Sequence, residues 1–456
     1  WTSASACFCP QSIRHGAGGQ CDNVAMHPKA LLEETTELVR RVLLLDHPAD
    51  AVVSRYFREH RNLGPRERAT LAETAYAVLR RKRLYEFLAR SGSGPQPRRL
   101  AILAFQAPRD FLKQALTDPE KAWLDACDAA GDADLLPAHH HNLPDWLADK
   151  LQAELGQPER DALAAALLDG AALDLRVNTL QAKRPEVQAE LAKAAIQSQA
   201  TPYSPWGLRL KGKPALQKLD AFTRGAIEVQ DEGSQLLALL LDAHRGEMVA
   251  DFCAGAGGKT LAIGATMRNT GRLYAFDVSA HRLAALKPRL ARSGLSNVHP
   301  VAIAHERDER IKRLAGKMDR VLVDAPCTGL GTLRRNPDLK WRQSPKDVAE
   351  LNAKQLAILS SAARLVKPGG RLVYATCSIL QSENEDVAAA FGAAHPDFEP
   401  LNAAQLLAAL KVEGAEALCA PAAETAGVAP GSYLRLWPHR HHTDGFFAAV
   451  WQRRGG

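Results

Sequence analysis

The chain of 456 residues is long enough for two or three domains, and its 46% hydrophobic content is sufficient to form buried cores. The formal net charge of +7 is modest for this length, and no apolar run approaches the ~20 residues of a membrane-spanning helix, which argues against an integral membrane protein. The eight cysteines include no C-x-x-C pair and the sequence shows no signal peptide, so we expect a cytoplasmic protein without structural disulfides.

Residues 1–25 differ in composition from the rest of the chain. They are rich in small residues and glycine, contain three cysteines, and begin with Trp1 instead of methionine. Their cysteine and histidine spacing matches no zinc-binding pattern, so no metal is expected. We expect a disordered tail that need not be native, with the natural start at Met26.

Residues 26–144 are predicted to form a helical domain. Apolar residues recur at helical spacing on one face, charged residues fill the other, and proline and glycine separate at least three helices. Between Arg40 and Arg99 stand fourteen Lys and Arg against six Asp and Glu, a net charge of +8 that leaves the rest of the chain near neutral. Such a basic concentration favours nucleic-acid binding, although a solvated helix surface would give the same count.

Residues 145–230 give a weaker pattern, which we interpret as a small α+β module that links the two larger domains. Residues 172–179 alternate like a half-buried strand. Just before the module, the three adjacent histidines 139–141 cannot share a helix face at ligand spacing, so a loop is expected there instead of a metal site.

Residues 231–456 alternate between strands and helices. This pattern predicts an α/β fold with a doubly wound, mostly parallel sheet that binds ligands at the carboxyl ends of its strands. Two final segments, 432–437 and 445–451, predict a closing hairpin that adds an antiparallel strand. The expected parallel strands are 248–252, 272–277, 298–304, 321–324 and 371–376.

The glycine-rich segment Asp251–Thr260, D-F-C-A-G-A-G-G-K-T, is predicted to bind S-adenosyl-L-methionine. A triphosphate-binding loop would need glycine where Cys253 stands, and a dinucleotide fingerprint is matched only in part because Thr260 occupies its sixth position. S-adenosyl-L-methionine requires glycines for close backbone approach and an acid at the end of the second strand, where Asp277 stands. The expected cofactor contacts are Cys253, Ala254, Gly255, Ala256, Gly257, Gly258, Lys259, Asp277, Arg282 and Asp324.

Two predicted strands end in cysteine motifs, V-L-V-D-A-P-C-T-G-L-G at 321–331 and L-V-Y-A-T-C-S at 372–378. If these strands are neighbours in a parallel sheet, Cys327 and Cys377 meet in one crevice. A lone buried cysteine is more often a packing residue, but two at matching strand ends need a chemical reason. Methyl transfer to carbon 5 of cytosine supplies one, because a thiolate that adds to carbon 6 makes carbon 5 nucleophilic.

The remaining site residues are predicted from their positions near the first thiol. Asp324 could hold the amino group and ring nitrogen of cytosine. An unperturbed cysteine with a pKa of about 8.5 is mostly protonated at neutral pH, and nearby cations would favour its thiolate. Arg334, Arg335 and Lys340 are expected to provide that positive potential and, with Pro326, to contact the substrate.

Six motifs resemble those of the RNA 5-methylcytosine methyltransferases of the Nop/Sun/RsmB family, over roughly residues 145–456. The resemblance implies a class I, Rossmann-like methyltransferase domain with Cys377 as the nucleophile and Cys327 assisting product release. The helical domain looks like the NusB-like RNA-binding domain of the bacterial branch that modifies small-subunit (16S) ribosomal RNA. This likeness implies that 16S ribosomal RNA is the substrate, and we expect the enzyme to be a monomer. The motifs are V-Q-D-E-G-S at 229–234, the glycine-rich loop, D-A-P-C-T-G-L-G, N-P-D-L-K at 336–340, Y-A-T-C-S with E-N-E at 383–385, and D-G-F-F at 444–447.

The sequence departs from this family pattern at two places. The usual proline of the cofactor loop is Ala256, which should change the stiffness of the loop more than its ligand. The acid expected to contact adenine after the third strand is replaced by His305, so either Asp308 takes its role through a shifted loop or the adenine contact is different.

Other functions remain open at this point. A methyltransferase of the same family could act on another ribosomal site or on transfer RNA. The basic segment alone would also suit an RNA-binding ribosome assembly factor, and the partial glycine pattern an NAD-dependent oxidoreductase, although the latter makes no use of either cysteine.

Overall fold

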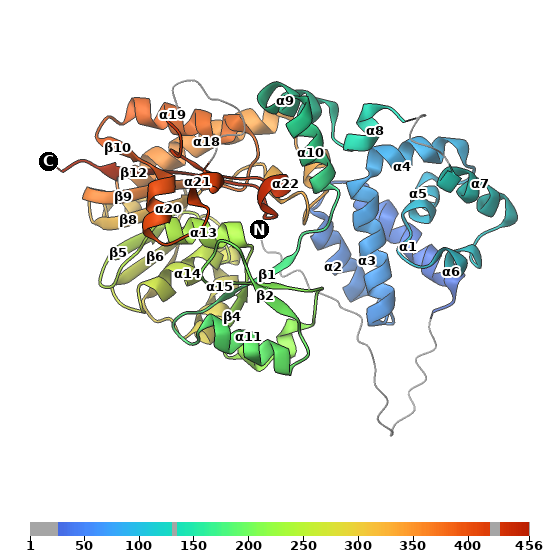
Figure 1. Ribbon diagram of the computed structural model, residues 1–456, viewed down its shortest axis with the longest axis horizontal. Helices are drawn as coiled ribbons and strands as arrows, with labels where there is room; N and C mark the ends of the chain where they lie inside the picture. The colour runs from blue at the N-terminus through green and yellow to red at the C-terminus, as the bar shows by residue number, and fades with distance from the viewer. Residues whose placement is uncertain (1–25, 130–134, 420–428, 456) are drawn as a thin grey trace.

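The computed structural model describes residues 26–129, 135–419 and 429–455, so the expected tail at 1–25 lies outside the described residues. The N-terminal part of the described chain is a helical bundle (Figure 1). Its core contains Leu32, Val39, Leu71 and Val78, all fully buried, which repeat at helical spacing along α1 and α3. The bundle helices are α1 (Pro28–Val42), α2 (Ala49–Glu59), α3 (Pro65–Arg80), α4 (Lys82–Leu88), α5 (Gln96–Ala104), α6 (Arg109–Lys113) and α7 (Asp118–Ala129).

The three adjacent histidines lie in a short helix, α8 (Pro137–His141), so the prediction of a loop is wrong. Pro137 starts the helix and Asn142 ends it in the left-handed conformation. The ring of His139 stacks on Phe87, and His141 Nε2 lies 2.8 Å from Asp161 Oδ1. Within residues 26–129, 135–419 and 429–455, no group of three or more His, Cys, Asp or Glu side chains could hold a metal ion.

A four-stranded antiparallel sheet with the order β2-β3-β1-β4 forms the linking module. The predicted strand is present as β1, but it is buried on both faces instead of one. Asp174 and Arg176 account for the difference, because Arg209 pairs with the former and Gln230 accepts from the latter. The elements of this part are α9 (Asp145–Leu155), α10 (Gln157–Leu167), β1 (Leu173–Val177), α11 (Arg184–Lys193), β2 (Ser198–Ala200), β3 (Gly207–Leu210), α12 (Asp220–Thr223) and β4 (Ile227–Val229).

The C-terminal part contains a mostly parallel sheet with the order β10-β12-β9-β8-β5-β6-β7, which confirms the predicted doubly wound fold. Chain order reverses between β5 and β8, so a crevice is expected at the carboxyl ends of these two strands. The closing hairpin is confirmed, since β12 pairs antiparallel with both β11 and β9. The strands are β5 (Met248–Asp251), β6 (Arg272–Asp277), β7 (Val298–Ala302), β8 (Met318–Asp324), β9 (Val366–Thr376), β10 (Phe398–Leu401), β11 (Leu434–Leu436) and β12 (Phe446–Arg453).

Helices cover both faces of this sheet (Figure 1). Side chains of β8 and β9 alternate between the two apolar cores, with Leu322 and Val373 in one and Val321 and Leu372 in the other. No helix in the described parts of the chain has the length and apolar content to cross a membrane. The helices are α13 (Glu232–Leu240), α14 (Gly258–Thr266), α15 (Ala280–Ser293), α16 (Glu309–Lys312), α17 (Leu339–Arg342), α18 (Pro345–Ala363), α19 (Glu385–Ala394), α20 (Ala403–Ala409), α21 (Ala415–Leu418) and α22 (Pro438–His441).

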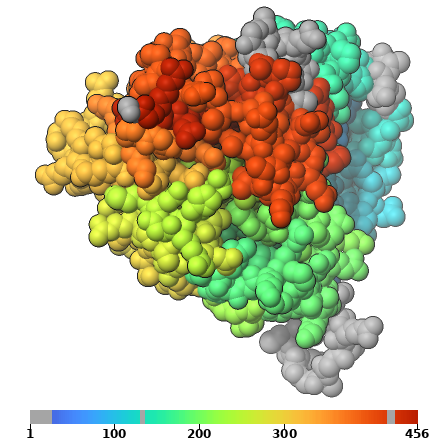
Figure 2. Space-filling model, turned by 60° about the vertical axis from the view of Figure 1, so that its left-hand side comes forward, coloured from blue at the N-terminus to red at the C-terminus, as the bar shows by residue number. Residues whose placement is uncertain are grey.

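Helices α9 and α10 pack against the segments that follow the two cysteines. Leu147 and Leu163 share a core with Leu330 and Ile379. In the space-filling view the green linking module and the orange C-terminal segments form a continuous surface (Figure 2). The boundaries 26–144, 145–230 and 231–456 remain our proposed division of the chain.

Candidate active site

The two cysteines of the strand-end motifs lie side by side. Strands β8 and β9 pair in parallel with Asp324 opposite Ala375, and both chains continue into the cysteine motifs. The Sγ atoms of Cys327 and Cys377 are 3.4 Å apart. The predicted meeting of the two thiols is therefore confirmed. Cys327 is buried, whereas Cys377 is partly exposed.

A buried carboxylate ties the two cysteine segments together. Glu383 accepts hydrogen bonds from the backbone N–H of Thr328 at 2.8 Å and from the hydroxyl of Thr328 at 2.5 Å. It also accepts from the hydroxyl of Ser378 and from Gln355 Nε2, the latter at 3.0 Å. Thr328 follows the first cysteine and Ser378 follows the second, so one side chain fixes the spacing of the thiols. The sequence contained Glu383 in its E-N-E motif, but no role was predicted for it.

The charges around the two thiols are unequal. The hydrogen bond to Cys377, burial, and the nearby Cys377 and Glu383 charges all raise the pKa of Cys327 well above its ordinary value. Lys259 Nζ lies 2.7 Å from Asp324 Oδ2. Burial favours the neutral amine, but the charges of Asp324 and Cys377 outweigh it, so the pKa of Lys259 is raised and the side chain is an ammonium. Lys259 is therefore a cation that is paired with Asp324 and also stabilised by the charge of Cys377.

The three cations predicted to act near the first thiol have other partners. Arg335 forms ion pairs with Asp444 at 2.6 Å and Asp231 at 2.9 Å. Arg334 donates to the carbonyl of Gly170 at 3.2 Å. Lys340 is only 1% exposed and donates to the carbonyl of Arg80 at 2.9 Å, so its burial contradicts the predicted contact with substrate.

The glycine-rich loop connects β5 to α14 and carries the residues predicted to bind the cofactor. Gly255 and Gly257 have φ angles of +56° and +81°, which favour glycine. The N–H of Gly255 donates to Asp277 Oδ2 at 2.8 Å, and Arg282 donates to the same oxygen at 2.8 Å. The structure therefore brings the loop, the acid at the end of β6 and Arg282 together.

This loop has the features that S-adenosyl-L-methionine requires. A Cβ added at Gly255 would meet nothing nearer than the guanidinium of Arg282 at 3.9 Å, so the backbone there is open to a ligand. Asp251 Oδ1 is buried without a hydrogen-bond partner, and burial raises the pKa of Asp251 to about 7. The carboxylate of Asp277 stands where ribose hydroxyls would be bound in a fold of this kind.

Neither residue considered for the adenine contact is free for it in this conformation. Asp308 caps α16 and accepts from the N–H groups of Ala304 and Arg310, both at 2.9 Å. These hydrogen bonds lower the pKa of Asp308. His305 Nδ1 accepts from the N–H of Arg307 at 3.1 Å. Both side chains thus stabilise the loop after β7.

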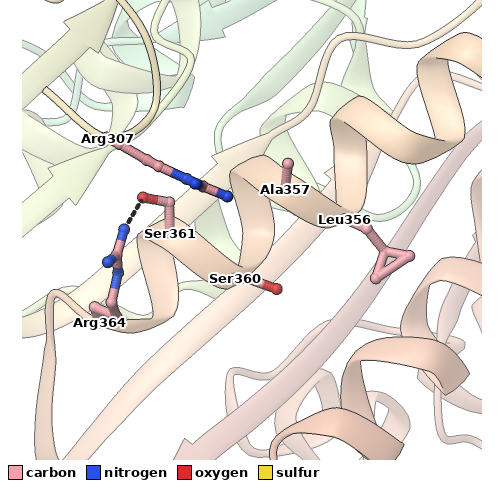
Figure 3. A pocket seen from close by; sticks show the side chains of 6 residues that line it. All are labelled: Arg307, Leu356, Ala357, Ser360, Ser361 and Arg364. Atoms are coloured by element: carbon pink, nitrogen blue, oxygen red, sulfur yellow. Dashed lines mark hydrogen bonds between the residues drawn. The ribbon is translucent and has the colours of Figure 1, made fainter.

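A cavity of about 460 Å³ lies elsewhere, between this loop and α18 (Figure 3). Arg307 projects over it from the loop, and Arg364 donates to Ser361 Oγ at 2.7 Å on the helix side. None of the predicted site residues lines this cavity, which is formed by Arg307, Leu356, Ala357, Ser360, Ser361 and Arg364.

Comparison with known proteins gives two family matches. The model for the 16S rRNA methyltransferase RsmB/F matches residues 238–452, and the model for the ferredoxin-like domain of RsmF/B-like methyltransferases matches residues 143–217. A probable ribosomal RNA small subunit methyltransferase B from Synechocystis sp. is 32% identical over 449 residues, which cover 90% of this chain and 97% of the relative.

Solved structures are similar over much of the chain. The crystal structure of PH0851 has a TM-score of 0.74 at 27% identity and covers 94% of this chain and 100% of its own. The crystal structure of NSun6 from Pyrococcus horikoshii with SFG has a TM-score of 0.57 at 21% identity and covers 69% of this chain and 99% of its own. At that identity the second likeness shows the fold alone.

Proposed function

This chain belongs to the family of 16S rRNA methyltransferases RsmB/F, and from that premise we propose that it methylates carbon 5 of a cytosine in small-subunit ribosomal RNA. S-adenosylmethionine supplies the methyl group in this family. The observation that carries the cytosine-C5 chemistry is the 3.4 Å separation of the Cys327 and Cys377 sulfur atoms. Methyl transfer to carbon 5 of cytosine uses one thiol to attack carbon 6 and a second thiol for product release, whereas methyl transfer to a nitrogen or an oxygen atom needs neither thiol.

We assign the nucleophile to Cys377. Its thiolate adds to carbon 6 of the cytosine, and carbon 5 then becomes the atom that accepts the methyl group. Lys259 is placed to stabilise the negative sulfur, because its ammonium interacts favourably with Cys377. Asp324, held by Lys259 at 2.7 Å, is assigned to the amino group of the cytosine.

We assign product release to Cys327. After methyl transfer, the proton on carbon 5 must leave and the bond between carbon 6 and sulfur must break. The sulfur of Cys327 lies beside the sulfur that has to depart, and the raised pKa of Cys327 means that Cys327 rests as a thiol. It is therefore not itself a competitor for carbon 6. As the bond between carbon 6 and the Cys377 sulfur breaks, the Cys327 thiol donates its proton to that sulfur, and the Cys327 thiolate so formed takes the proton that leaves carbon 5, which restores both thiols. This division of roles agrees with the one that the family resemblance implies.

The helical bundle is assigned to RNA binding. Its segment from Arg40 to Arg99 has a net charge of +8, and α2, α3 and the turn between them carry exposed arginines such as Arg55, Arg58, Arg61 and Arg66. Backbone phosphates of folded ribosomal RNA are the proposed partners of these side chains.

The direct test uses purified protein, S-adenosylmethionine with a labelled methyl group and unmethylated small-subunit ribosomal RNA. Nucleoside analysis after digestion is expected to find the label in 5-methylcytidine. Label in another nucleoside would refute the cytosine-C5 assignment while leaving the RNA methyltransferase assignment intact, and the absence of any label would refute both.

A further inference from the structure

One face of helix α15 lies against the cofactor loop. Arg282, Leu286 and Arg289 are spaced four and three residues apart, so they share this face. Arg282 donates to Asp277 at 2.8 Å, and the Leu286 side chain packs so closely on the loop that a Cβ at Gly257 would come within 2.1 Å of it. Arg289 Nη1 donates to the carbonyl of Ala256 at 2.6 Å.

The guanidinium of Arg289 is also held at its opposite side. Its Nε and Nη2 atoms donate to Glu228 Oε2 at 3.2 and 3.0 Å. Glu228 is 4% exposed and stands on β4, in the linking module. Its other oxygen accepts from Arg292, whose guanidinium stacks 4.3 Å from the ring of Phe222. The linking module is thereby connected to the cofactor loop through one arginine.

The bond from Arg289 holds the loop at position 256, between two glycines with positive φ. The N–H groups of Ala254, Gly255 and Gly257 donate to Phe276, Asp277 and Ala254, respectively. Position 256 contributes its carbonyl, and that carbonyl accepts from Arg289. Both neighbours of Ala256 are glycines with positive φ, which have more backbone freedom than any other residue type. A charged donor to this carbonyl is one of the stronger hydrogen bonds available to a protein.

We propose that Arg289 is a positioning residue for S-adenosylmethionine. Through its hydrogen bond to the carbonyl of Ala256, Arg289 holds the cofactor loop in the conformation that binds the cofactor. Glu228 of the linking module orients the guanidinium for this purpose. The assignment rests on the proposed function in one respect only, namely that the loop binds S-adenosylmethionine. It gives the linking module a part in cofactor binding in addition to its connecting role.

The first test compares Arg289→Met with the matched control Arg292→Met, both in the full chain. Each variant removes one guanidinium from Glu228, but only the first removes a bond to the loop. By calorimetric titration, Arg289→Met is expected to weaken S-adenosylmethionine binding by about tenfold or more, and Arg292→Met by less than about twofold. The KM for the cofactor should rise in Arg289→Met while kcat changes little, and the amides of residues 253–258 should exchange hydrogen faster.

The second test adds Ala256→Pro to Arg289→Met. Proline restricts the backbone of the loop without using an N–H that the loop's own hydrogen bonds need, so the double variant is expected to recover most of the lost affinity. Equal effects of the two methionine variants, or unchanged amide exchange in Arg289→Met, would overturn the positioning role. If the unchanged protein binds S-adenosylmethionine but Arg289→Met binds it equally well, only this inference fails. If the unchanged protein does not bind it, the proposed cofactor fails as well.

Discussion

At the scale of single residues, the two thiols are distinguished by the charges beside them. The hydrogen bond to Cys377, burial and the nearby charge of Glu383 raise the pKa of Cys327, whereas the charge beside Cys377 is the ammonium of Lys259. The raised pKa of Cys327, which makes Cys327 the poorer nucleophile, therefore supports the proposed assignment of Cys377 in addition to the resemblance. The sequence could place both cysteines and Lys259 on loops at strand ends. It could not show which cation faces which sulfur, because that depends on side chains meeting across the sheet.

The role of Glu383 is tested by Glu383→Gln. The amide nitrogen of glutamine cannot accept the hydrogen bonds that the carboxylate accepts, so at least one donor on Thr328 or Ser378 loses its partner. We expect the free energy of unfolding to fall by about 1–3 kcal/mol and methyl transfer to fall with it. Chemical denaturation and a methyl-transfer assay measure the two effects. The exposed neighbour Asp386 provides the control, since Asp386→Asn should leave both unchanged; equal effects would show that Glu383 has no special role.

The buried carboxyl of Asp251 predicts a pH dependence of stability. Burial raises its pKa to about 7 from an ordinary value of 3.8. Between these two pH values the folded chain holds a proton that the unfolded chain has released, so this group's contribution to stability falls as pH rises, by up to about 1.4 kcal/mol per unit. Asp251→Asn removes the contribution. Its stability relative to the unchanged protein should therefore increase from pH 4 to pH 7 and level off above, and parallel stability curves would contradict this.

At the scale of elements, the central strands were predictable and the linking sheet was not. β5, β6, β8 and β9 are apolar runs that end in small and polar residues, a pattern typical of buried parallel strands. β1 was misjudged as half-buried because Asp174 and Arg176 count as solvent-facing in an alternating pattern. Their partners Arg209 and Gln230 are 35 and 54 residues away in sequence, so only the fold reveals that these charges are satisfied inside the protein.

The contact between the two cysteine segments depends on a glycine, which Gly331→Ala tests. The N–H of Gly331 donates to the carbonyl of Cys377 at 2.9 Å, and an added Cβ would lie 2.1 Å from the carbonyl oxygen of Gly445. The backbone must shift, which should cost about 1–3 kcal/mol of stability. Because the shift separates the thiols, methyl transfer should fall on the order of 10²-fold.

The matched control is Gly392→Ala in helix α19, where an added Cβ meets nothing within 4 Å. This change should raise stability by about 0.5–1 kcal/mol, because alanine is the better helix former. Thermal and chemical unfolding distinguish the two variants. A Gly331→Ala protein as stable and as active as the control would show that the packing at Gly331 is unimportant.

At the scale of the whole molecule, the bundle is docked on the segment that follows the first cysteine. The N–H of Ala49 donates to Asp338 at 3.2 Å, Lys340 donates to the carbonyl of Arg80, and Trp341 Nε1 donates to the carbonyl of Leu79 at 2.7 Å. The sequence predicted a substrate contact for Lys340 and could not reveal this docking role, because the partner of its side chain is a backbone carbonyl, which no sequence pattern marks. Burial and the neighbouring charges of Arg80 and Arg81 lower the pKa of Lys340 to about 7.

This docking predicts that Trp341→Ala weakens the junction between bundle and catalytic domain. The variant loses a partly buried indole that packs on the bundle core, together with its hydrogen bond to Leu79. We expect a loss of about 2–3 kcal/mol and two separated unfolding transitions where the unchanged protein shows a more cooperative one. Trp341→Phe keeps most of the packing and should lose less. A single transition at an unchanged midpoint in Trp341→Ala would indicate that the junction contributes little.

The most direct measurement of the proposed chemistry is the covalent protein–RNA adduct, detected as a slow-migrating band on a denaturing gel after incubation with RNA and S-adenosylmethionine. Cys327→Ser should accumulate this adduct, because Cys377 can still attack carbon 6 while release is impaired. Cys377→Ser should form no adduct and transfer no methyl group. An adduct that accumulates in Cys377→Ser and is absent from Cys327→Ser would reverse the two roles, and full activity in both variants would contradict a mechanism through paired thiols.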